Sequence, residues 1–544
     1  MKNHERAVRL FGLFFFFIII YLIIGTRLFI LQVYQRNFYT ELGNQQYHVK
    51  VTTKPPRGII YDRNGIPLAV NVDSFSLFIT PRTLKNKMQT IEFIKNNYPS
   101  AYEKYSKNPH ANFLYIKRKL TKNETELIKN QQNIDLNILK EPARHYPHPE
   151  TAQIIGFTTI DNEGAAGIEL FFNESLAGST TTYFLARDAR SGLYHFDKTT
   201  LHQGNEPESI TLSIDSALQY LAHQELLKTI NQFQSTEGSV VIMDPTTGEI
   251  LTMISHPIFD PNKIDDVNLE SVKAKPVTDA YELGSVIKIF PALAALSENV
   301  VTPEEIIDCE NTKMMFMDGV KFSTWKAHGL LPYEDVVALS NNVGTAKVTK
   351  RLGKNLYKHF IELGFSKKTG IELPAEQAGY INPPSAWTAQ SPFSLSFGYE
   401  IRATLIQLAQ AIGVFTNGGT LIAPTLLKNK KSVSRKTWYE QSIIDQVRVM
   451  MRKTITDGTA HRAIIKNVFT LGKTGTAMLL DEHGHYDPDH NIYTFAGIIE
   501  INNYKRVIII FIKEAAQKNL YASSVSVPLF SRIAHKMLIH ERQI

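Results

Sequence analysis

The hydrophobic positions of this sequence are densest near its start. From residue 10 to residue 26, seventeen consecutive residues carry no charge, and thirteen of them are Leu, Ile or Phe. As a helix with a rise of about 1.5 Å per residue, this run spans roughly 25 Å, the short end of what a bilayer core needs. Arg27 can extend its charge to the interface while apolar side chains continue to Tyr34. The pattern predicts a transmembrane anchor over residues 10–34, preceded by a tail of residues 1–9.

Two alternatives for this segment are a cleavable signal peptide and a buried core helix. Lys2, Arg6 and Arg9 supply the basic start of a signal peptide, but no small-x-small cleavage site follows the apolar run. An uncleaved anchor is therefore favoured. More basic residues follow the span than precede it, and charge alone would therefore favour the opposite orientation. Long domains, however, cross a membrane largely regardless of charge. We expect the tail in the cytoplasm and the rest of the chain outside it.

The stretch after the anchor is mixed and polar. Asp-Arg-Asn-Gly at residues 62–65 has the chemistry of a tight turn between two short strands, IIY and IPLAV. Residues 82–140 are rich in Lys and Asn with helical spacing, for example at Leu120, Leu127 and Ile128. We expect this part to be a solvated accessory region.

The pattern changes near residue 210. Asp215 is placed to cap a helix whose apolar residues, from Leu218 to Ile230, recur every three to five positions. Further along, the pattern predicts strands over residues 239–243 and 249–254, strands over 494–500 and 507–512, and a last helix over 527–540. Together these elements predict an α/β (α+β) fold in which helices cover both faces of one antiparallel sheet.

Composition narrows the class of protein. The 544 residues are 43% hydrophobic and 20% charged, which suits several packed domains and excludes a disordered chain. The net charge of +7 favours acidic neighbours such as anionic lipid head groups, but no run of four Lys or Arg occurs, so nucleic acid is not an expected partner. Cys309 is the single cysteine, which excludes an intrachain disulfide and a Cys-rich metal site.

Ser285 and Lys288 are candidate catalytic residues. They begin a segment that is almost wholly apolar, so a helix starting near Ser285 would be buried and would carry both side chains on one face. A serine needs a base to become a nucleophile, and a lysine in a dry pocket has a pKa low enough to serve. Ser285 alone also suits an ordinary helix N-cap. A second Ser-x-x-Lys at residues 323–326 has no buried helix to hold it and is set aside.

Two further motifs offer polar groups. Ser340 and Asn342 follow a short helical pattern and present a hydroxyl and an amide on a loop. Lys473-Thr474-Gly475-Thr476 lies within a predicted strand, where glycine lets a substrate backbone approach and hydroxyls can bind a carboxylate. A second Lys-Thr-Gly at residues 368–370 lies in a loop and is the weaker candidate.

We expect no metal and no cofactor. A polar loop has metal-like spacing, but it follows the Lys-Thr-Gly strand and suits a solvated turn better. Its acidic and histidine residues are Asp481, Glu482, His483, His485, Asp487 and His490.

The order and spacing of the three motifs resemble the penicillin-recognising serine acyltransferases. Ser285 is followed after 55 residues by Ser340 and after a further 133 by Lys473. The likeness extends over residues 10–540 to the class B penicillin-binding proteins, the peptidoglycan D,D-transpeptidases of the cell-division (FtsI) type. Other matching segments are residues 57–65, 167–169, 213–215, 238–251, 260–262, 396–399 and 526–528.

This resemblance implies an architecture. It consists of a transmembrane helix, an elongated β-rich pedestal or dimerisation-like domain over residues 35–209, and a transpeptidase domain over residues 210–544. The last domain is expected to contain an antiparallel five-stranded sheet flanked by helices, as in serine β-lactamases.

The resemblance also assigns roles. Ser285 would be the acylated nucleophile and Lys288 its base, with Ser340 and Asn342 relaying protons and holding the substrate amide. Lys473 would orient that relay. Thr474 and Thr476 would bind the terminal carboxylate beside Gly475, and the backbone N–H groups of Ser285 and Thr476 would form an oxyanion hole.

The expected activity is cross-linking of peptidoglycan stem peptides that end in D-Ala-D-Ala, with acylation by β-lactams. By resemblance, the protein is a single-pass protein of the bacterial inner membrane whose catalytic domain lies outside the cytoplasm. Its expected partners are a polytopic membrane glycosyltransferase and other division proteins. An elongation role, a non-catalytic scaffold and a β-lactamase-like hydrolase are the alternatives, although no Glu-x-x-Leu-Asn follows Ser340 to supply a deacylating base.

The sequence departs from the family pattern at three places. Glu400 stands where the family usually has glycine, and Ala522-Ser523-Ser524 stands where a Gly-Gly pair is common. Ile289-Phe290-Pro291 replaces the frequent proline directly after the lysine.

Overall fold

The computed structural model describes residues 2–187, 194–265 and 267–544, which form two compact units. Unit 1 contains Met1–Arg57 and Ala177–Pro207, and unit 2 contains Gly58–Leu176 and Glu208–Ile544. We describe each unit by itself.

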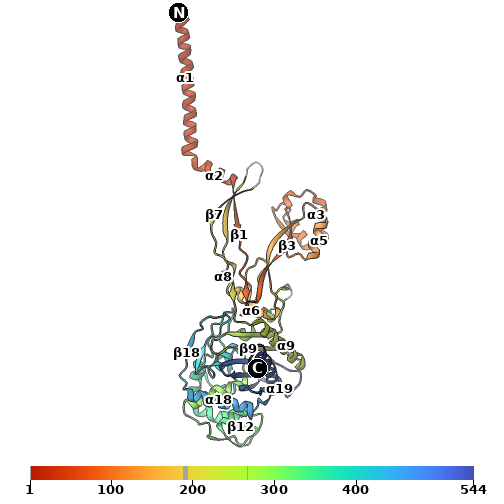
Figure 1. Cartoon of the computed structure of the whole chain (residues 1–544), viewed down its shortest axis with the longest axis vertical. Coiled ribbons are helices and arrows are strands. Elements are labelled where there is room, and N and C mark those ends of the chain that lie inside the picture. Colours follow the sequence, from red (N-terminus) through yellow and green to blue (C-terminus); the bar gives the residue numbers. More distant parts are fainter. Residues whose placement is uncertain (1, 188–193, 266) are drawn as a thin grey trace. The chain divides into compact units, whose positions relative to one another are not determined.

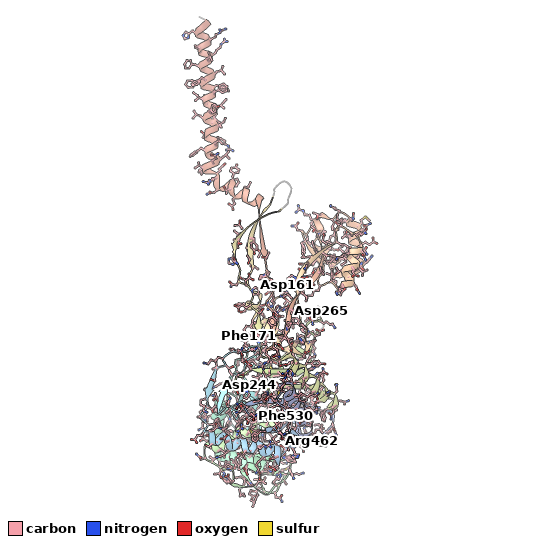
Figure 2. All side chains as sticks on the ribbon, in the orientation of Figure 1. Asp161, Phe171, Asp244, Asp265, Arg462 and Phe530 are labelled. Atoms are coloured by element: carbon pink, nitrogen blue, oxygen red, sulfur yellow. The ribbon has the colours of Figure 1, made fainter. Side chains whose placement is uncertain are left out.

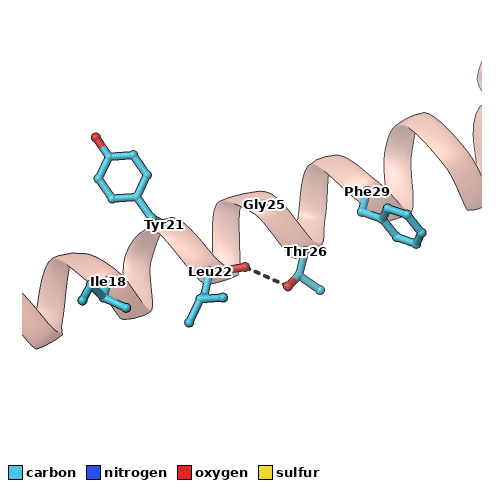
Figure 3. Close-up of a pocket in the computed structure, with 6 residues that line it drawn as sticks. All are labelled: Ile18, Tyr21, Leu22, Gly25, Thr26 and Phe29. Atoms are coloured by element: carbon cyan, nitrogen blue, oxygen red, sulfur yellow. Dashed lines mark hydrogen bonds between the residues drawn. The ribbon is translucent and has the colours of Figure 1, made fainter.

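Unit 1 begins with the predicted apolar helix. Its elements are α1 (Lys2–Phe29), a π-helical turn (Ile30–Tyr34), α2 (Arg36–Tyr47) and a sheet of order β1-β6-β7, with β1 at His48–Thr53, β6 at Thr181–Arg187 and β7 at Tyr194–His202 (Figure 1). Within the described chain, Arg6–Tyr34 is the one helical segment long and apolar enough to cross a membrane. Its large side chains are exposed, and Figure 3 shows part of it, where the Thr26 hydroxyl donates to the Leu22 carbonyl (2.7 Å).

The first part of unit 2 is built on a small sheet. Its strands are β2 (Ile60–Tyr61), β3 (Pro67–Ile79), β4 (Leu114–Lys117), β5 (Asn137–His145) and β8 (Ile210–Thr211), in the order β4-β3-β2-β8 with β5 paired to β3. The predicted turn at residues 62–65 is confirmed. The Asp62 carboxylate accepts the amides of Asn64 and Ile66 (2.8 Å each), which closes the turn between β2 and β3.

Residues 82–140 are not simply a solvated region, as the sequence suggested. They form α3 (Lys87–Asn97), α4 (Pro99–Lys107) and α5 (Lys122–Asn130), which pack on β3 and β4. A separate apolar core holds them together, made of Leu77, Ile79, Ile94, Ala101, Tyr105, Ile116, Leu120 and Ile128. Leu127 stays exposed, so the helical spacing was correct but only one face of α5 is apolar.

The predicted antiparallel sheet is confirmed in the second part of unit 2. It has the order β10-β9-β21-β20-β19, with β9 (Glu237–Met243), β10 (Ile250–His256), β19 (Phe469–Leu480), β20 (Tyr486–Ile501) and β21 (Tyr504–Lys513). Both predicted hairpins are present, joined by the pairing of β21 with β9. Every residue of β9 is buried, as expected for a strand covered on both faces.

Helices cover both faces of this sheet. On one face lie α9 (Ser216–Phe233), which Asp215 caps as predicted, and α19 (Ala522–His540), which begins earlier than expected. Phe530 of α19, labelled in Figure 2, packs against Phe495 of β20 with ring centres 4.7 Å apart. The larger core on the opposite face includes α12 (Ile289–Ser297), α13 (Tyr333–Ala338), α14 (Asn342–Leu352), α17 (Leu405–Gly413) and α18 (Gln441–Thr456).

Short elements complete unit 2. The remaining helices are α6 (Ala152–Ile155), α7 (Gly167–Phe171), α8 (Asn173–Ala177), α10 (Leu269–Val272), α11 (Lys275–Thr278), α15 (Asn355–Glu362) and α16 (Ser391–Phe397). The remaining strands form two-stranded ribbons: β11 (Ile306–Asp308) with β14 (Leu330–Pro332), β12 (Met314–Met317) with β13 (Val320–Ser323), β15 (Tyr380–Ile381) with β16 (Ile401–Arg402), and β17 (Thr420–Ile422) with β18 (Ser434–Lys436).

Candidate active site

The three sequence motifs meet at one cavity of about 590 Å³ in unit 2. Ser285, Ser340 and Asn342 line it together with Thr474 and Thr476. These residues come from a turn before α12, from the α13–α14 connection and from β19. The sheet and its covering helices therefore bring together groups that lie up to 191 positions apart in the sequence.

Ser285 lies in a 3-10 turn, η4 (Gly284–Lys288), and not in the α-helix that the sequence predicted. The α-helix begins one residue after Lys288. In a 3-10 turn, side chains three positions apart are eclipsed, so Ser285 and Lys288 lie on the same face. Among the described residues the Ser285 hydroxyl has no hydrogen-bond partner, and it faces the cavity.

Lys288 is buried and held by the second motif. Its side-chain nitrogen lies within hydrogen-bond distance of the Ser340 carbonyl (2.7 Å), the Ser340 hydroxyl (3.3 Å) and the Asn342 side-chain oxygen. Burial lowers the pKa of Lys288 well below its usual value, and the nearby charge of Lys473 lowers it further. The neutral amine, which is the form that can accept a proton, is therefore reached at a lower pH than in an ordinary lysine.

Ser340 has a left-handed backbone, with φ of +59°, which is uncommon for a residue with a side chain. The neighbouring Asn341 fixes this turn, because its side-chain oxygen caps α14 by accepting the Gly344 amide (2.9 Å). The next residue, Asn342, donates its side-chain amide to the Ser323 carbonyl (2.5 Å). One amide hydrogen of Asn342 is left for a ligand.

Lys473 is the second buried lysine. Its ammonium group donates to the Ser340 hydroxyl (2.9 Å) and to the Thr474 carbonyl (3.2 Å). Burial lowers the pKa of Lys473 to about 7. Ser340 therefore lies between two lysines that both bind its hydroxyl, and this arrangement is a path along which a proton can move.

The remaining residues of the third motif have distinct contacts. The Thr474 hydroxyl shares a hydrogen bond with the Thr459 hydroxyl (2.6 Å), and the Thr476 hydroxyl accepts the Ala522 amide (3.1 Å). A Cβ at Gly475 would lie 2.5 Å from the Leu283 carbonyl oxygen. The sequence suggested that this glycine admits a substrate backbone, but the close neighbour is the protein's own backbone, which leads into the Ser285 turn.

Three residues around the cavity were missed by the sequence analysis. Thr459 lines it beside Thr474, and Tyr399 and Tyr486 line it with their rings in a T-shaped contact, 4.8 Å between centres. The signal for Tyr399 was available, since it ends a segment that matches the family, whereas a lone threonine such as Thr459 carries no pattern.

Glu400, which stands where the family usually has glycine, keeps a backbone conformation that glycine adopts without strain. Its φ is +57°, and its amide donates to the Glu282 carboxylate (2.9 Å). Tyr486 donates to the same carboxylate (3.0 Å). Burial raises the pKa of Glu282, and these two donors oppose that rise.

The second copies of the motifs lie as the sequence analysis expected. Ser323 ends β13 and has no helix after it, although it lines the same cavity. The loop at residues 368–370 lies away from the cavity, where the amides of Thr369 and Gly370 donate to Glu376 (2.6 and 3.1 Å). The polar segment after β19 is only partly the turn that the sequence predicted, because its residues from 486 onward belong to β20. There His490 pairs with Asp487 (2.7 Å), and the described residues contain no cluster of three possible metal ligands.

Comparisons with known proteins show which family the chain resembles. Residues 238–535 match the family model of the penicillin binding protein transpeptidase domain, and residues 52–205 match that of the penicillin-binding protein dimerisation domain. The "Probable peptidoglycan D,D-transpeptidase PbpC" of Pseudomonas aeruginosa is 28% identical over 540 residues, which cover 98% of this chain and 95% of that protein.

Other relatives are similar over most of their length. The "Stage V sporulation protein D" of Bacillus subtilis is 29% identical and covers 99% of this chain and 86% of its own. The "Peptidoglycan D,D-transpeptidase FtsI" of Escherichia coli is 26% identical, with 88% and 82% covered. The solved structure of Penicillin binding protein 3 from Mycobacterium tuberculosis with aztreonam is 22% identical, has a TM-score of 0.69, and covers 90% of this chain and 97% of that one.

Proposed function

Because the chain belongs to the class B penicillin-binding proteins and is a peptidoglycan D,D-transpeptidase, we propose that it works through an acyl-enzyme on Ser285. The observation that carries this proposal is the meeting of the Ser285 turn, the buried Lys288 and the β19 strand around one cavity. Penicillins and stem peptides that end in D-Ala-D-Ala are the expected acylating agents.

In the acylation step, the Ser285 oxygen attacks the carbonyl of the penultimate D-alanine. Lys288, whose pKa is lowered by burial and by the charge of Lys473, takes the hydroxyl proton in its neutral form. The backbone N–H groups of Ser285 and Thr476 face the developing oxyanion. Collapse of the tetrahedral intermediate breaks the peptide bond, and the leaving amine of the last D-alanine receives a proton.

Ser340 and Lys473 supply that proton. The Ser340 hydroxyl lies between the two lysine side-chain nitrogens, 3.3 Å from that of Lys288 and 2.9 Å from that of Lys473. A proton taken by Lys288 can therefore pass through Ser340 to the leaving group. In the second half of the reaction, the amine of an acceptor stem peptide enters along the same path and releases Ser285.

The terminal carboxylate of the donor binds at the hydroxyls of Thr474 and Thr476. Thr459 orients the first of these, since the two hydroxyls are 2.6 Å apart. Lys473 adds positive charge behind them when it is protonated. Asn342 holds the donor peptide through the amide hydrogen that Ser323 leaves free.

The cellular setting is part of the same proposal. Residues 10–34 anchor the chain in the bacterial inner membrane with the N-terminus in the cytoplasm, so that the catalytic domain acts outside it. A role in septal wall synthesis is supported by relatives named FtsI, with a polytopic glycosyltransferase and other division proteins as partners. The sporulation name of one relative makes a sporulation role the competing assignment.

Mass spectrometry after penicillin treatment tests the acyl-enzyme. We expect one adduct per chain, mapped to the peptide that contains Ser285 and absent from Ser285→Ala. Ser323→Ala is the matched control, because Ser323 lines the same cavity and starts the other Ser-x-x-Lys sequence. An adduct that survives in Ser285→Ala and disappears in Ser323→Ala would move the nucleophile to Ser323.

A further inference from the structure

Unit 2 contains a second cavity, of about 380 Å³, that shares no lining residue with the catalytic one. Its size is that of a pocket for a small molecule. Its walls come from the end of α15, the loop at 364–370, α17 and the β17–β18 ribbon, whose second strand is labelled in Figure 1. The loop contains the second Lys-Thr-Gly sequence, which the catalytic site does not use.

Positive charge gathers around this cavity. Four of the described residues that line it are basic and none is acidic; the basic ones are Lys367, Lys368, Lys430 and Arg435. The segment from 428 to 436 carries five basic residues and no Asp or Glu. The rest of the lining is neutral, and its apolar members are Ile361, Leu421, Ala423, Pro424 and Val433. Because like charges repel, this grouping suits a cavity that receives an anion.

Two of the four basic side chains are held in place by buried carboxylates. The Lys430 ammonium pairs with Glu372 (2.5 Å), and the Arg435 guanidinium pairs with Glu362 (2.6 Å). Neither carboxylate lines the cavity. An ammonium has three N–H donors and a guanidinium has five, so both basic groups keep donors for a ligand.

The other two basic side chains, those of Lys367 and Lys368, are exposed and have no acidic partner in the part of the chain that the structure describes. Their backbone is held on both sides. The Gln407 side-chain amide donates to the Lys367 carbonyl (2.7 Å), and Glu376 accepts the two backbone amides that follow Lys368 (2.6 and 3.1 Å). A fixed loop therefore presents two unpaired charges beside the two that are anchored.

We propose that this cavity binds a soluble phosphate ester. A phosphate monoester carries up to two negative charges on three strongly accepting oxygens, so it can satisfy several of the basic side chains at once, whereas a carboxylate carries one charge. The organic part of the ester lies against the apolar wall. The head group of phosphatidic acid has the same phosphate chemistry and is the alternative source of the ligand.

Calorimetric titration of the full chain in neutral detergent with glucose 1-phosphate tests the site. We expect one site per chain with a Kd below about 1 mM, weakened at least about threefold as salt rises from about 0.05 to 0.5 M, and no binding of glucose. The same titration with a short-chain phosphatidic acid is the second arm. Binding of that lipid without binding of glucose 1-phosphate would overturn the soluble ligand in favour of a lipid head group. Saturable binding of neither would overturn the site.

Lys367→Gln/Lys368→Gln should weaken the binding of glucose 1-phosphate about tenfold or more, because two charge-assisted contacts are lost. Lys431→Gln/Lys466→Gln is the matched control, since it removes the same charge from two exposed lysines that do not line the cavity. Thermal melting near that of the wild type is the control for folding in both variants. Equal weakening in the two variants would mean attraction to a basic surface in general and would overturn the site.

Discussion

At the scale of single residues, the side-chain nitrogens of the buried Lys288 and Lys473 both lie within hydrogen-bond distance of the Ser340 hydroxyl. Among the described residues, no carboxylate pairs with either lysine. Burial and the charge of Lys473 lower the pKa of Lys288, and burial lowers the pKa of Lys473. Each lysine is therefore easier to deprotonate than a lysine in water, and the acylation that we propose at neutral pH uses that shift.

Lys288→Ala is expected to lower the rate of penicillin acylation by about 10²- to 10⁴-fold, because the general base is lost. Stopped-flow measurement of acylation, together with a thermal melt, checks this. A cooperative melt near that of the wild type is the control for folding. Near-normal acylation in this variant would mean that another group takes the Ser285 proton.

The acylation rate of the wild type should rise with pH. Lys288 accepts a proton only when neutral, and its pKa is lowered, so its neutral fraction grows as pH rises and does so below the pH at which an ordinary lysine loses its proton. We expect the rising limb of the pH–rate profile of penicillin acylation to lie well below the usual pKa of lysine, about 10.4. A rate that does not change with pH below that value would show that Lys288 is not the base.

Most of the candidate residues were found from the sequence, and the failures have a physical reason. Ser285, Ser340 and Lys473 were found because each belongs to a motif; Ser285 and Ser340 line one cavity, and Lys473 lies behind it and contacts the Ser340 hydroxyl. The contact between Thr459 and Thr474 could not be found, since nothing in the local sequence indicates that a loop residue will face a strand 15 positions later. The roles assigned to these residues stay predictions.

At the scale of elements, the Ser285 turn and β19 approach each other more closely than side chains allow. Gly284 has a φ of +62°, and a Cβ on it would lie 2.6 Å from the Thr476 carbonyl oxygen. Gly475 faces the same turn from β19. The separation of Ser285 from Thr476, the proposed nucleophile and a proposed oxyanion donor, is thus set by two glycines, one on each element.

Gly475→Ala is expected to lower acylation by about 10²-fold, because displacement of the turn by about 1 Å misaligns Ser285. The same substitution at Gly329, which has open space around it and no positive φ, is the control for a general effect of losing glycine. Both variants are compared by penicillin labelling rate and thermal melting. A Gly475→Ala enzyme that is acylated at the wild-type rate would show that the turn tolerates the extra methyl group.

The buried side chain of Arg144 joins two of the segments that match the family, residues 57–65 and 167–169. Arg144 of β5 donates to Glu169 of α7 (2.6 Å), to the Gly58 carbonyl (2.7 Å) and to Asn71 (3.2 Å), and both charged groups are shielded from water. Arg144→Met leaves the Glu169 charge buried and should cost about 3–5 kcal/mol of unfolding free energy.

Denaturant unfolding measures that cost, and Arg144→Met/Glu169→Leu is the matched control. The double variant should be more stable than Arg144→Met, because no unpaired charge remains. If the two variants are equally stable, the loss comes from packing and not from the charge.

The elements predicted best are those whose apolar residues form an unbroken run that ends at a turn. The hairpins of β9–β10 and β20–β21 were found because their strands are apolar and end at Pro, Gly or Asn turns. The core of α3, α4 and α5 was missed because Ile94, Tyr105 and Ile128 are separated by many Lys and Asn residues. The 3-10 form of the Ser285 turn was also missed, since an apolar run does not distinguish 3-10 from α geometry.

At the scale of the whole molecule, the anchor helix carries more aromatic residues than lipid contact requires. Phe14, Phe15, Phe16 and Phe17 surround α1 at a depth where interfacial aromatics are not expected, and all four are exposed. We infer that this span packs against a membrane partner, in addition to holding the enzyme at the bilayer. The domain boundaries at residues 35 and 210 likewise stay predictions.

Replacing residues 10–26 by a Leu/Ala helix of equal hydrophobicity should preserve membrane insertion and penicillin binding but impair complementation of a depleted strain. Membrane fractionation and fluorescent penicillin labelling are the controls. Full complementation by the Leu/Ala helix would mean that residues 10–26 only hold the protein in the membrane.

The strand order has a consequence for how the enzyme is made. β21 (Tyr504–Lys513) lies between β9 (Glu237–Met243) and β20, so the centre of the sheet is completed by residues synthesised about 270 positions after β9. Until then β9 presents an open edge, and β19 and β20 can pair with each other but cannot join β9 and β10. The Ser285 turn is made early but packs on a strand that arrives late. A ribosome that stalls before β21 therefore leaves a chain with every catalytic side chain and no active site, a substrate for proteases and not a partly active enzyme.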